Sequence, residues 1–291
     1  TMSIPMPYAD VNDIRIFYEV LGSGDATPLV MTHGFAGPSG HWRPELLPFA
    51  EKRPLVIYDV RGHSQTTVPA NKDSYSMPLF AGDLAALLKT IGIERAHIGG
   101  VSMGGMVTAQ FAVDFPQMCA SVIIGDSTCG NGVDPGPGGD WERTMQKGMQ
   151  MLMHMVEKYG LKQTILREHE WKQTNDPHIA DSPYSLDDDL ERESMMTDAG
   201  HIGAAHAMLT RPDLTSRIGA IAAPTLIMCG AWDDFLPCAR RDHSLIAGSR
   251  FVVRERCGHG SRWRLETFHS EIEAFLADVE SGRDVAGERT V

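Results

Sequence analysis

The sequence predicts an α/β fold in which a mostly parallel, doubly wound sheet is flanked by helices and interrupted by an inserted helical cap. Three observations support this prediction. Strand-like apolar runs alternate with helical stretches, a pattern typical of βαβ units and parallel sheets. Small and chemically active residues follow the ends of the predicted strands. A Gly- and Pro-rich stretch at 129–140 then separates this pattern from a long helical segment rich in methionine.

The first half of the chain supplies strands and helices in alternation. Residues 6–20 read as two antiparallel edge strands joined by a turn at Asn12 and Asp13. Apolar residues in the segment 77–91 recur at helical spacing, so this segment is predicted to be a helix that packs on the sheet. The further strands are predicted at 29–31, 55–58, 95–99 and 120–125, and a second helix at 105–113.

The second half begins with the insertion and then returns to the sheet. We interpret 130–210 as a helical cap, and 2–129 together with 211–280 as the core that carries it. The polar residues 281–291 are expected to form a loose C-terminal tail. In the returning core, helices are predicted at 213–221 and 265–279, and strands at 225–229 and 250–255.

Composition excludes several classes of protein. A chain of 291 residues is long enough for one α/β domain with an inserted subdomain. Its formal net charge of −12 and the lack of a basic stripe argue against a nucleic-acid partner. No run of 18 apolar residues is present, so no membrane span is expected. Five scattered cysteines and no visible signal peptide indicate a reducing, cytoplasmic location.

The candidate nucleophile is Ser102, at the centre of the G-x-S-x-G pentapeptide 100–104. The pentapeptide follows a predicted strand and precedes a predicted helix, so the serine lies on a sharp strand-to-helix turn. Its flanking glycines suit a bend too tight for side chains. A hydroxyl held in this way is exposed at a helix N-terminus, which is a good position for a nucleophile.

A serine hydroxyl needs a base within hydrogen-bond reach and a carboxylate that orients that base. His259 is the expected base, because it follows a glycine at the end of the strand 250–255 and precedes the last helix. Three carboxylates lie after strand ends and are candidates for the acid: Asp233, its neighbour Asp234, and Asp126. Asp234 and Asp126 also have simpler interpretations, as a solvated residue and a strand-end cap.

The small-residue loop 33–37 follows the strand 29–31 and is expected to form one side of an oxyanion hole. Its backbone N–H at Phe35 and the N–H of Met103, the residue after the serine, are the expected donors to a developing oxyanion. Gly34 is expected to contact the substrate.

Further pocket residues are predicted in two places. Trp42 either lines the pocket or packs beneath the loop 33–37. In the cap, Trp141, Met145 and Met149 are candidates, although methionines in such a segment are first of all helix-core residues. The histidines of the cap lack metal-ligand spacing, so neither a metal nor a cofactor is expected.

Taken together, these motifs resemble the α/β-hydrolase superfamily, in its cap-bearing esterase, lactonase and haloperoxidase-like branch. The resemblance extends from about residue 8 to about residue 276. It favours Asp233 as the acid, because this residue has the family's spacing between Gly230 and Pro237. The chain departs from the family pattern at Ser64, where a glycine is frequent. The matching residues are His33-Gly34, Trp42, Asp59-x-Arg61-Gly62-His63, Ser102, the run 221–226, Asp233 and Gly258-His259.

The resemblance implies a cofactor-free serine hydrolase that cleaves a small to medium apolar carboxylic ester or lactone through an acyl-enzyme. The expected partner is thus a small apolar molecule. Two alternatives stay open. The same fold and triad serve C–C bond hydrolases of ring-cleavage products, since a fold does not choose between chemistries. The chain could also be a hydrolase-fold protein that binds a small ligand without turnover.

Overall fold

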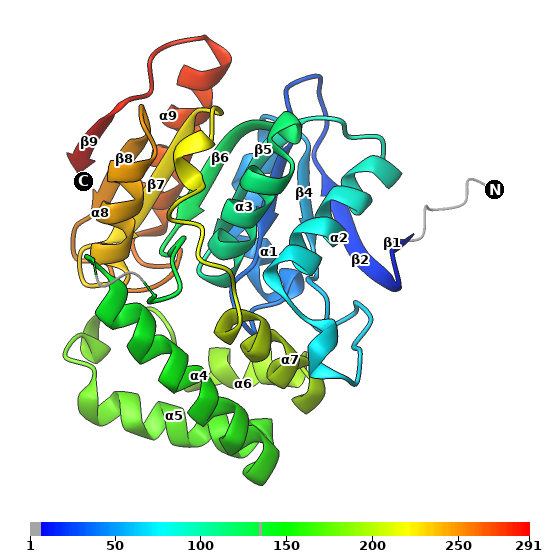
Figure 1. Cartoon of the computed structure of the whole chain (residues 1–291), viewed down its shortest axis with the longest axis vertical. Coiled ribbons are helices and arrows are strands. Elements are labelled where there is room, and N and C mark those ends of the chain that lie inside the picture. The colour runs from blue at the N-terminus through cyan, green and yellow to red at the C-terminus, as the bar shows by residue number, and fades with distance from the viewer. Residues whose placement is uncertain (1–6, 134–135) are drawn as a thin grey trace.

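The computed structural model describes residues 7–133 and 136–291. The expected start of the core at residue 2 and the centre of the Gly- and Pro-rich stretch, 134–135, lie outside the described residues. The described chain forms a nine-stranded sheet of order β1-β2-β4-β3-β5-β6-β7-β8-β9 (Figure 1). The strands are β1 Tyr8–Val11, β2 Ile14–Leu21, β3 Leu29–Thr32, β4 Leu55–Tyr58, β5 Ala96–Val101, β6 Cys119–Gly125, β7 Thr225–Gly230, β8 Arg250–Arg254 and β9 Gly287–Thr290.

The sheet is mostly parallel, as predicted. Only β1 and β2 form an antiparallel hairpin, with Asn12 at a φ of 50° in the turn, and β2 also pairs antiparallel with β4. From β4 to β9 every pairing is parallel. The central strands β3, β4 and β5 are buried along their whole length, as expected for a sheet covered on both faces.

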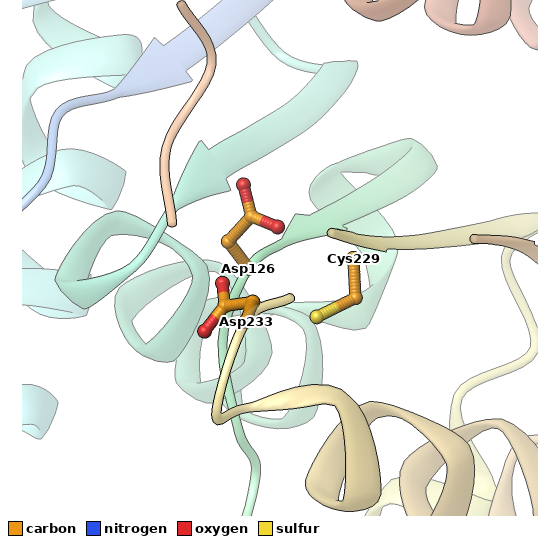
Figure 2. Close-up of side chains that lie close together, drawn as sticks. All are labelled: Asp126, Cys229 and Asp233. Atoms are coloured by element: carbon orange, nitrogen blue, oxygen red, sulfur yellow. The ribbon is translucent and has the colours of Figure 1, made fainter. Parts of the chain in front are cut away.

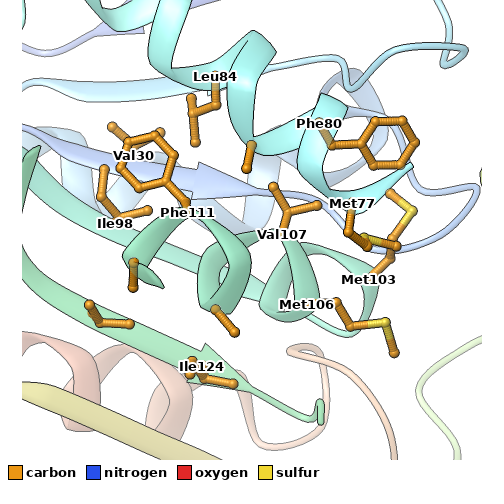
Figure 3. Close-up of a cluster of buried hydrophobic side chains, with 14 of the residues drawn as sticks. Val30, Met77, Phe80, Leu84, Ile98, Met103, Met106, Val107, Phe111 and Ile124 are labelled. Carbon is orange, nitrogen blue, oxygen red and sulfur yellow. The ribbon is translucent and has the colours of Figure 1, made fainter. Parts of the chain in front are cut away.

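Helices cover both faces of the sheet, and each face has its own apolar core. On one face, α2 (Met77–Thr90), α3 (Met103–Asp114) and α8 (Leu236–Leu245) pack on residues such as Ile98 and Ile124. Figure 3 shows α3 beside α2, with Val107 and Phe111 pointing into this core. On the other face, α1 (Ser39–Leu46) and α9 (Leu265–Glu280) bury a second cluster around Phe268. The doubly wound arrangement is thus confirmed.

Four helices follow one another between β6 and β7 and lie to one side of the sheet in Figure 1. None of the helices described here has the length and hydropathy to span a bilayer. The first of these helices ends at Gly160, whose φ of 77° is not helical, and the second begins directly after it. The four helices are α4 Gly139–Tyr159, α5 Leu161–Asn175, α6 Leu186–Ser194 and α7 Asp198–Leu209. Their treatment as a separate cap domain with limits at 130 and 210 stays a prediction.

The last of these helices, α7, is interlocked with the loop that follows β4. A Cβ atom on Gly200 would lie 2.0 Å from the carbonyl oxygen of Gly62, and one on Gly203 would lie 2.5 Å from the ring of Tyr75. Both distances are far below a van der Waals contact, so only glycine permits this close approach. Consequently α7 packs closely against the segment that follows β4.

Two expectations about local structure are wrong. The C-terminal tail is not loose, because Gly287–Thr290 forms strand β9 and pairs in parallel with β8. Its side chains are all exposed, so no apolar alternation signalled the strand, and backbone pairing holds it. The predicted helix at 213–221 is reduced to a short 3₁₀ turn at Ile218–Ala220. Asp213 accepts the backbone N–H of Thr215 and fixes a local turn there instead.

Candidate functional site

Ser102 occupies the sharp turn between β5 and α3, as the pentapeptide predicts. Its φ of 58° and ψ of −122° are strained for a residue with a side chain. The neighbouring glycines make this turn possible. A Cβ on Gly104 would lie 2.0 Å from the carbonyl oxygen of Thr32, and one on Gly100 would lie 2.3 Å from the oxygen of Gly104. The backbone N–H of Ser102 donates to the oxygen of Gly125 at 2.9 Å, which ties the turn to β6.

Three side chains predicted from separate strand ends form one hydrogen-bonded chain. Nε2 of His259 lies 2.9 Å from Oγ of Ser102, and Nδ1 lies 2.8 Å from Oδ2 of Asp233. The Asp233 carboxylate is buried, and its other oxygen accepts the N–H of Phe235 at 3.0 Å. With the proton on Nδ1 donated to the carboxylate, Nε2 is free to accept the serine proton.

The electrostatic setting of His259 favours its protonated form. Burial lowers the pKa of this imidazole, but the charge and hydrogen bond of Asp233 and the charge of Asp126 together outweigh burial, with Lys172 opposing them. Their sum raises the pKa of His259 from 6.5 to about 9. The imidazole is therefore a stronger base than a free histidine.

The two alternative acids lie elsewhere. Asp234 is exposed, directly after Asp233. Asp126 is buried at the end of β6, where Figure 2 shows it close to Asp233 and Cys229. Its carboxylate accepts from Nη2 of Arg254 at 2.8 Å rather than from His259.

Asp126, Cys229 and Asp233 place potential metal ligands within 4.8 Å of one another. The two carboxylates already serve Arg254 and His259. Burial raises the pKa of the Cys229 thiol well above its usual value, whereas a metal would need the thiolate. This set of donors therefore does not suit a cation.

The loop after β3 approaches the serine as expected for an oxyanion hole. A Cβ on Gly34 would touch Cβ of Ser102 at 3.5 Å. The side chain of His33 supports the loop. Its Nε2 accepts the N–H of Val60 at 3.0 Å, so its Nδ1 carries the proton and donates to the carbonyl oxygen of Gly34 at 2.8 Å. Burial lowers the pKa of His33 to about 4, so this histidine stays neutral.

The two expected oxyanion donors are available. Within the described residues, no hydrogen bond inside the protein engages the backbone N–H of Phe35 or of Met103. The Phe35 ring, half-buried on the apolar core, packs against the ring of His201 on α7 at 4.5 Å between centroids. One side of the loop 33–37 thus packs against α7.

The predicted pocket residues separate into two groups. On α4, Trp141, Met145 and Met149 are four residues apart and all pack toward the core. Trp141 contacts Phe235 edge-on at 5.7 Å, and Phe235 stacks on the ring of His259 at 5.3 Å.

Trp42 belongs to the second group. It is buried in the core on the α1 side, and its N–H donates to Ser261 at 2.9 Å. Its place in the pocket or beneath the loop 33–37 stays a prediction. Sequence reasoning missed Phe235. Its signal was a large apolar residue two positions after the candidate acid.

Comparison with known proteins places the chain among similar folds. The model of the alpha/beta hydrolase fold family matches residues 27–262, well over half of the chain. A 2-hydroxy-6-oxo-6-phenylhexa-2,4-dienoate hydrolase from Comamonas testosteroni is 26% identical over 277 residues, covering 87% of this chain and 88% of that protein.

Two solved structures share the fold at lower identity. The enol-lactonase from Burkholderia xenovorans LB400 superposes with a TM-score of 0.77 at 22% identity, over 93% of this chain and 100% of that one. A structure from a study of carboxylesterases of the thaumarchaeon Nitrososphaera gargenis gives a TM-score of 0.79 at 20% identity, over 95% and 100%. Because the family model matches residues 27–262, which include β3 to β8 and the inserted helices, the chain belongs to the α/β-hydrolase fold family and is a hydrolase of that fold.

Proposed function

We propose that this protein is a cofactor-free serine hydrolase that cleaves a small to medium apolar carboxylic ester or lactone through an acyl-enzyme. The observation that supports this proposal most strongly is the continuous hydrogen-bonded chain from Oγ of Ser102 through His259 to Asp233. A nucleophile, a base and an orienting acid in this geometry are the arrangement required for acyl transfer.

In the proposed mechanism, Ser102 attacks the substrate carbonyl while Nε2 of His259 takes its proton. Asp233 holds the imidazole in the correct tautomer and stabilises the imidazolium that forms. The N–H groups of Phe35 and Met103 bind the tetrahedral oxyanion. His259 then returns the proton to the leaving alcohol. In the second half, His259 takes a proton from water as the water oxygen attacks the acyl carbon, and it then returns this proton to Oγ of Ser102 as the acid leaves.

The apolar character of the proposed substrate rests on the surroundings of His259. Phe235 stacks on the imidazole, and Trp141 extends this apolar surface toward α4. Met145 and Met149 continue it along the same helix face. Methionines adapt their shape to different ligands, which favours a pocket that accepts a range of apolar acyl or alcohol groups.

A second candidate is hydrolysis of a C–C bond in a ring-cleavage product. Its support is the similarity, over most of both chains, to the Comamonas enzyme named for a 2-hydroxy-6-oxo-6-phenylhexa-2,4-dienoate substrate. A vinylogous diketone of this class and an ester panel, assayed side by side, distinguish the two candidates.

The proposal is tested with Ser102→Ala and a fluorophosphonate probe that labels activated serines. The native protein should be labelled and should hydrolyse short-chain esters or lactones, whereas Ser102→Ala should lose labelling and about 10³-fold or more of its activity. Ser127→Ala is the matched control, because this hydroxyl lies nearby, donates to the backbone carbonyl oxygen of Ser102 at 2.7 Å, and makes no hydrogen bond to a histidine within the described residues. Turnover that survives in Ser102→Ala would refute the serine mechanism.

A further inference from the structure

Asp126 and Arg254 form a buried ion pair at the point where the loops of the candidate site converge. Both side chains are almost fully inaccessible, and Nη2 of Arg254 donates to Oδ2 of Asp126 at 2.8 Å. Asp126 itself has a φ of 43°, a conformation that costs energy in most residues and is retained only where the surroundings enforce it. Because burial of charges is itself costly, such a pair is weak evidence for a gain in stability, and its contacts are what distinguish it.

The carboxylate of Asp126 connects two loops that carry different parts of the proposed triad. Its Oδ1 accepts the N–H of Gly230, three residues before Asp233, at 2.9 Å. Its Oδ2 accepts the N–H of Gly260, directly after His259, at 3.1 Å. Figure 2 shows the two aspartates side by side, one after β6 and the other on the loop after β7.

Arg254 holds the loop of His259 a second time. Its Nη2 donates to the oxygen of Gly260 at 3.0 Å and its Nη1 to the oxygen of Trp263 at 2.9 Å. The backbone on the C-terminal side of His259 is therefore fixed at two points. The residue before Asp126, Gly125, accepts the N–H of Ser102, so the same segment also anchors the turn of the proposed nucleophile.

We propose that Asp126, together with Arg254, is a positioning residue that fixes the loop of Asp233 and the loop of His259 relative to each other and to Ser102. This inference rests on the proposed function, because it assigns the pair a purpose in aligning that triad. The pair does not touch the reacting atoms. It acts by keeping the distances around His259 short, and an error of about 1 Å in such a constellation can cost about 10²-fold in rate.

The substitution Asp126→Asn breaks this arrangement for a definite chemical reason. Every group that hydrogen-bonds to the carboxylate is a donor: the N–H groups of Gly230 and Gly260 and the guanidinium of Arg254. An amide offers one acceptor oxygen and one NH₂ donor. Whichever way it turns, one loop loses its acceptor and meets a second donor instead.

The experiment measures kcat per labelled site, with the sites counted by the fluorophosphonate, and the pH profile of kcat/KM. For Asp126→Asn we expect kcat per labelled site to fall by about 10²-fold with KM little changed. The acid limb of the profile should also move to lower pH, because the charge of Asp126 contributes to the raised pKa of His259.

Asp83→Asn is the matched control, because Asp83 and Arg61 form an equally buried pair that binds neither loop. It should lower stability and yield but leave kcat per labelled site and the acid limb unchanged. Where Asp126→Asn folds poorly because Arg254 is left unpaired, the double variant Asp126→Asn/Arg254→Met decides. Removal of both charges of a buried pair is often tolerated. The hydrogen bonds that connect the loop of Asp233 to the loop of His259 are still lost in this double variant.

Two results have distinct meanings. If the native protein is neither labelled nor active on any ester, lactone or diketone, the proposed function fails, and the positioning role fails with it. If the native protein is active and both Asp126 variants keep the native kcat per labelled site and the native acid limb, the positioning role alone is overturned.

Discussion

Replacement of Asp233 by asparagine should cripple the enzyme for a reason that can be followed atom by atom. In the native site Oδ1 of Asp233 accepts the N–H of Phe235 at 3.0 Å, and Oδ2 accepts from Nδ1 of His259 at 2.8 Å. In the variant the amide oxygen must stay on the side of the Phe235 N–H, which offers only a donor. The NH₂ group then faces Nδ1 of His259.

An NH₂ group facing Nδ1 forces that nitrogen to act as an acceptor, so the proton moves to Nε2. Nε2 then points a hydrogen at Oγ of Ser102, and His259 cannot act as a base. A wrong tautomer of this kind costs about 10³- to 10⁴-fold in kcat. At about 1.4 kcal/mol per factor of ten, this is about 4 to 5.5 kcal/mol of lost transition-state stabilisation.

The assay is kcat on a chromogenic short-chain ester, with folding checked by circular dichroism. Asp234→Asn is the matched control, since its carboxylate is adjacent in sequence but exposed, and it should lose little activity. The reasoning would be refuted if Asp233→Asn were mild and Asp126→Asn alone abolished turnover, because the acid would then be the carboxylate at the end of β6.

Three further results are expected. The pKa of His259 is raised to about 9, and only the unprotonated imidazole accepts the serine proton. We therefore expect kcat/KM to keep rising from pH 7 to pH 9. A plateau of kcat/KM reached below pH 7 would contradict this assignment. Trp141→Ala, which removes the edge-on contact with Phe235, should raise KM for bulky apolar esters and leave acetate esters little changed; equal effects on both would exclude Trp141 from the pocket. Gly203→Ala should lower the free energy of unfolding in urea by about 1 to 3 kcal/mol, because the methyl group would collide with the Tyr75 ring, and an unchanged unfolding midpoint would disprove the interlock.

Much of the candidate site could be predicted because its parts are short local patterns. Ser102, His259 and Asp233 each follow a strand with a recognisable glycine nearby, and parallel strands bring their carboxyl ends to one edge of the sheet. The role of Arg254 could not be predicted in this way. It lies within β8, where it reads as one more strand residue, and only the strand order β6-β7-β8 brings it near Asp126.

The local errors have a related cause. Strand β9 has the sequence Gly-Glu-Arg-Thr with every side chain exposed, so it leaves no periodic signal, and its pairing with β8 comes from backbone groups. The segment 213–221 carries helix-compatible residues, but the Asp213 carboxylate accepts hydrogen bonds from the N–H and hydroxyl of Thr215 and fixes a different turn. In both places tertiary or local hydrogen bonds outweigh propensity.

The close fit of α7 against the sheet domain bears on how new specificities arise in this scaffold. Gly200 and Gly203 leave no room for larger side chains at that contact. The helices α4, α5 and α6 are instead joined by Gly160 and by the connection at 176–185, where the chain can be cut and rejoined. A graft of foreign helices should therefore exchange α4 to α6 and retain α7, and the new helices must preserve the packing of α4 on α7 and the bond from the Leu161 N–H to Asp198. The same boundary, between α6 and α7, applies to natural variation and to protein engineering. We therefore expect the exchangeable part of this protein to be smaller than its inserted segment and to end before Thr197, the N-cap of α7.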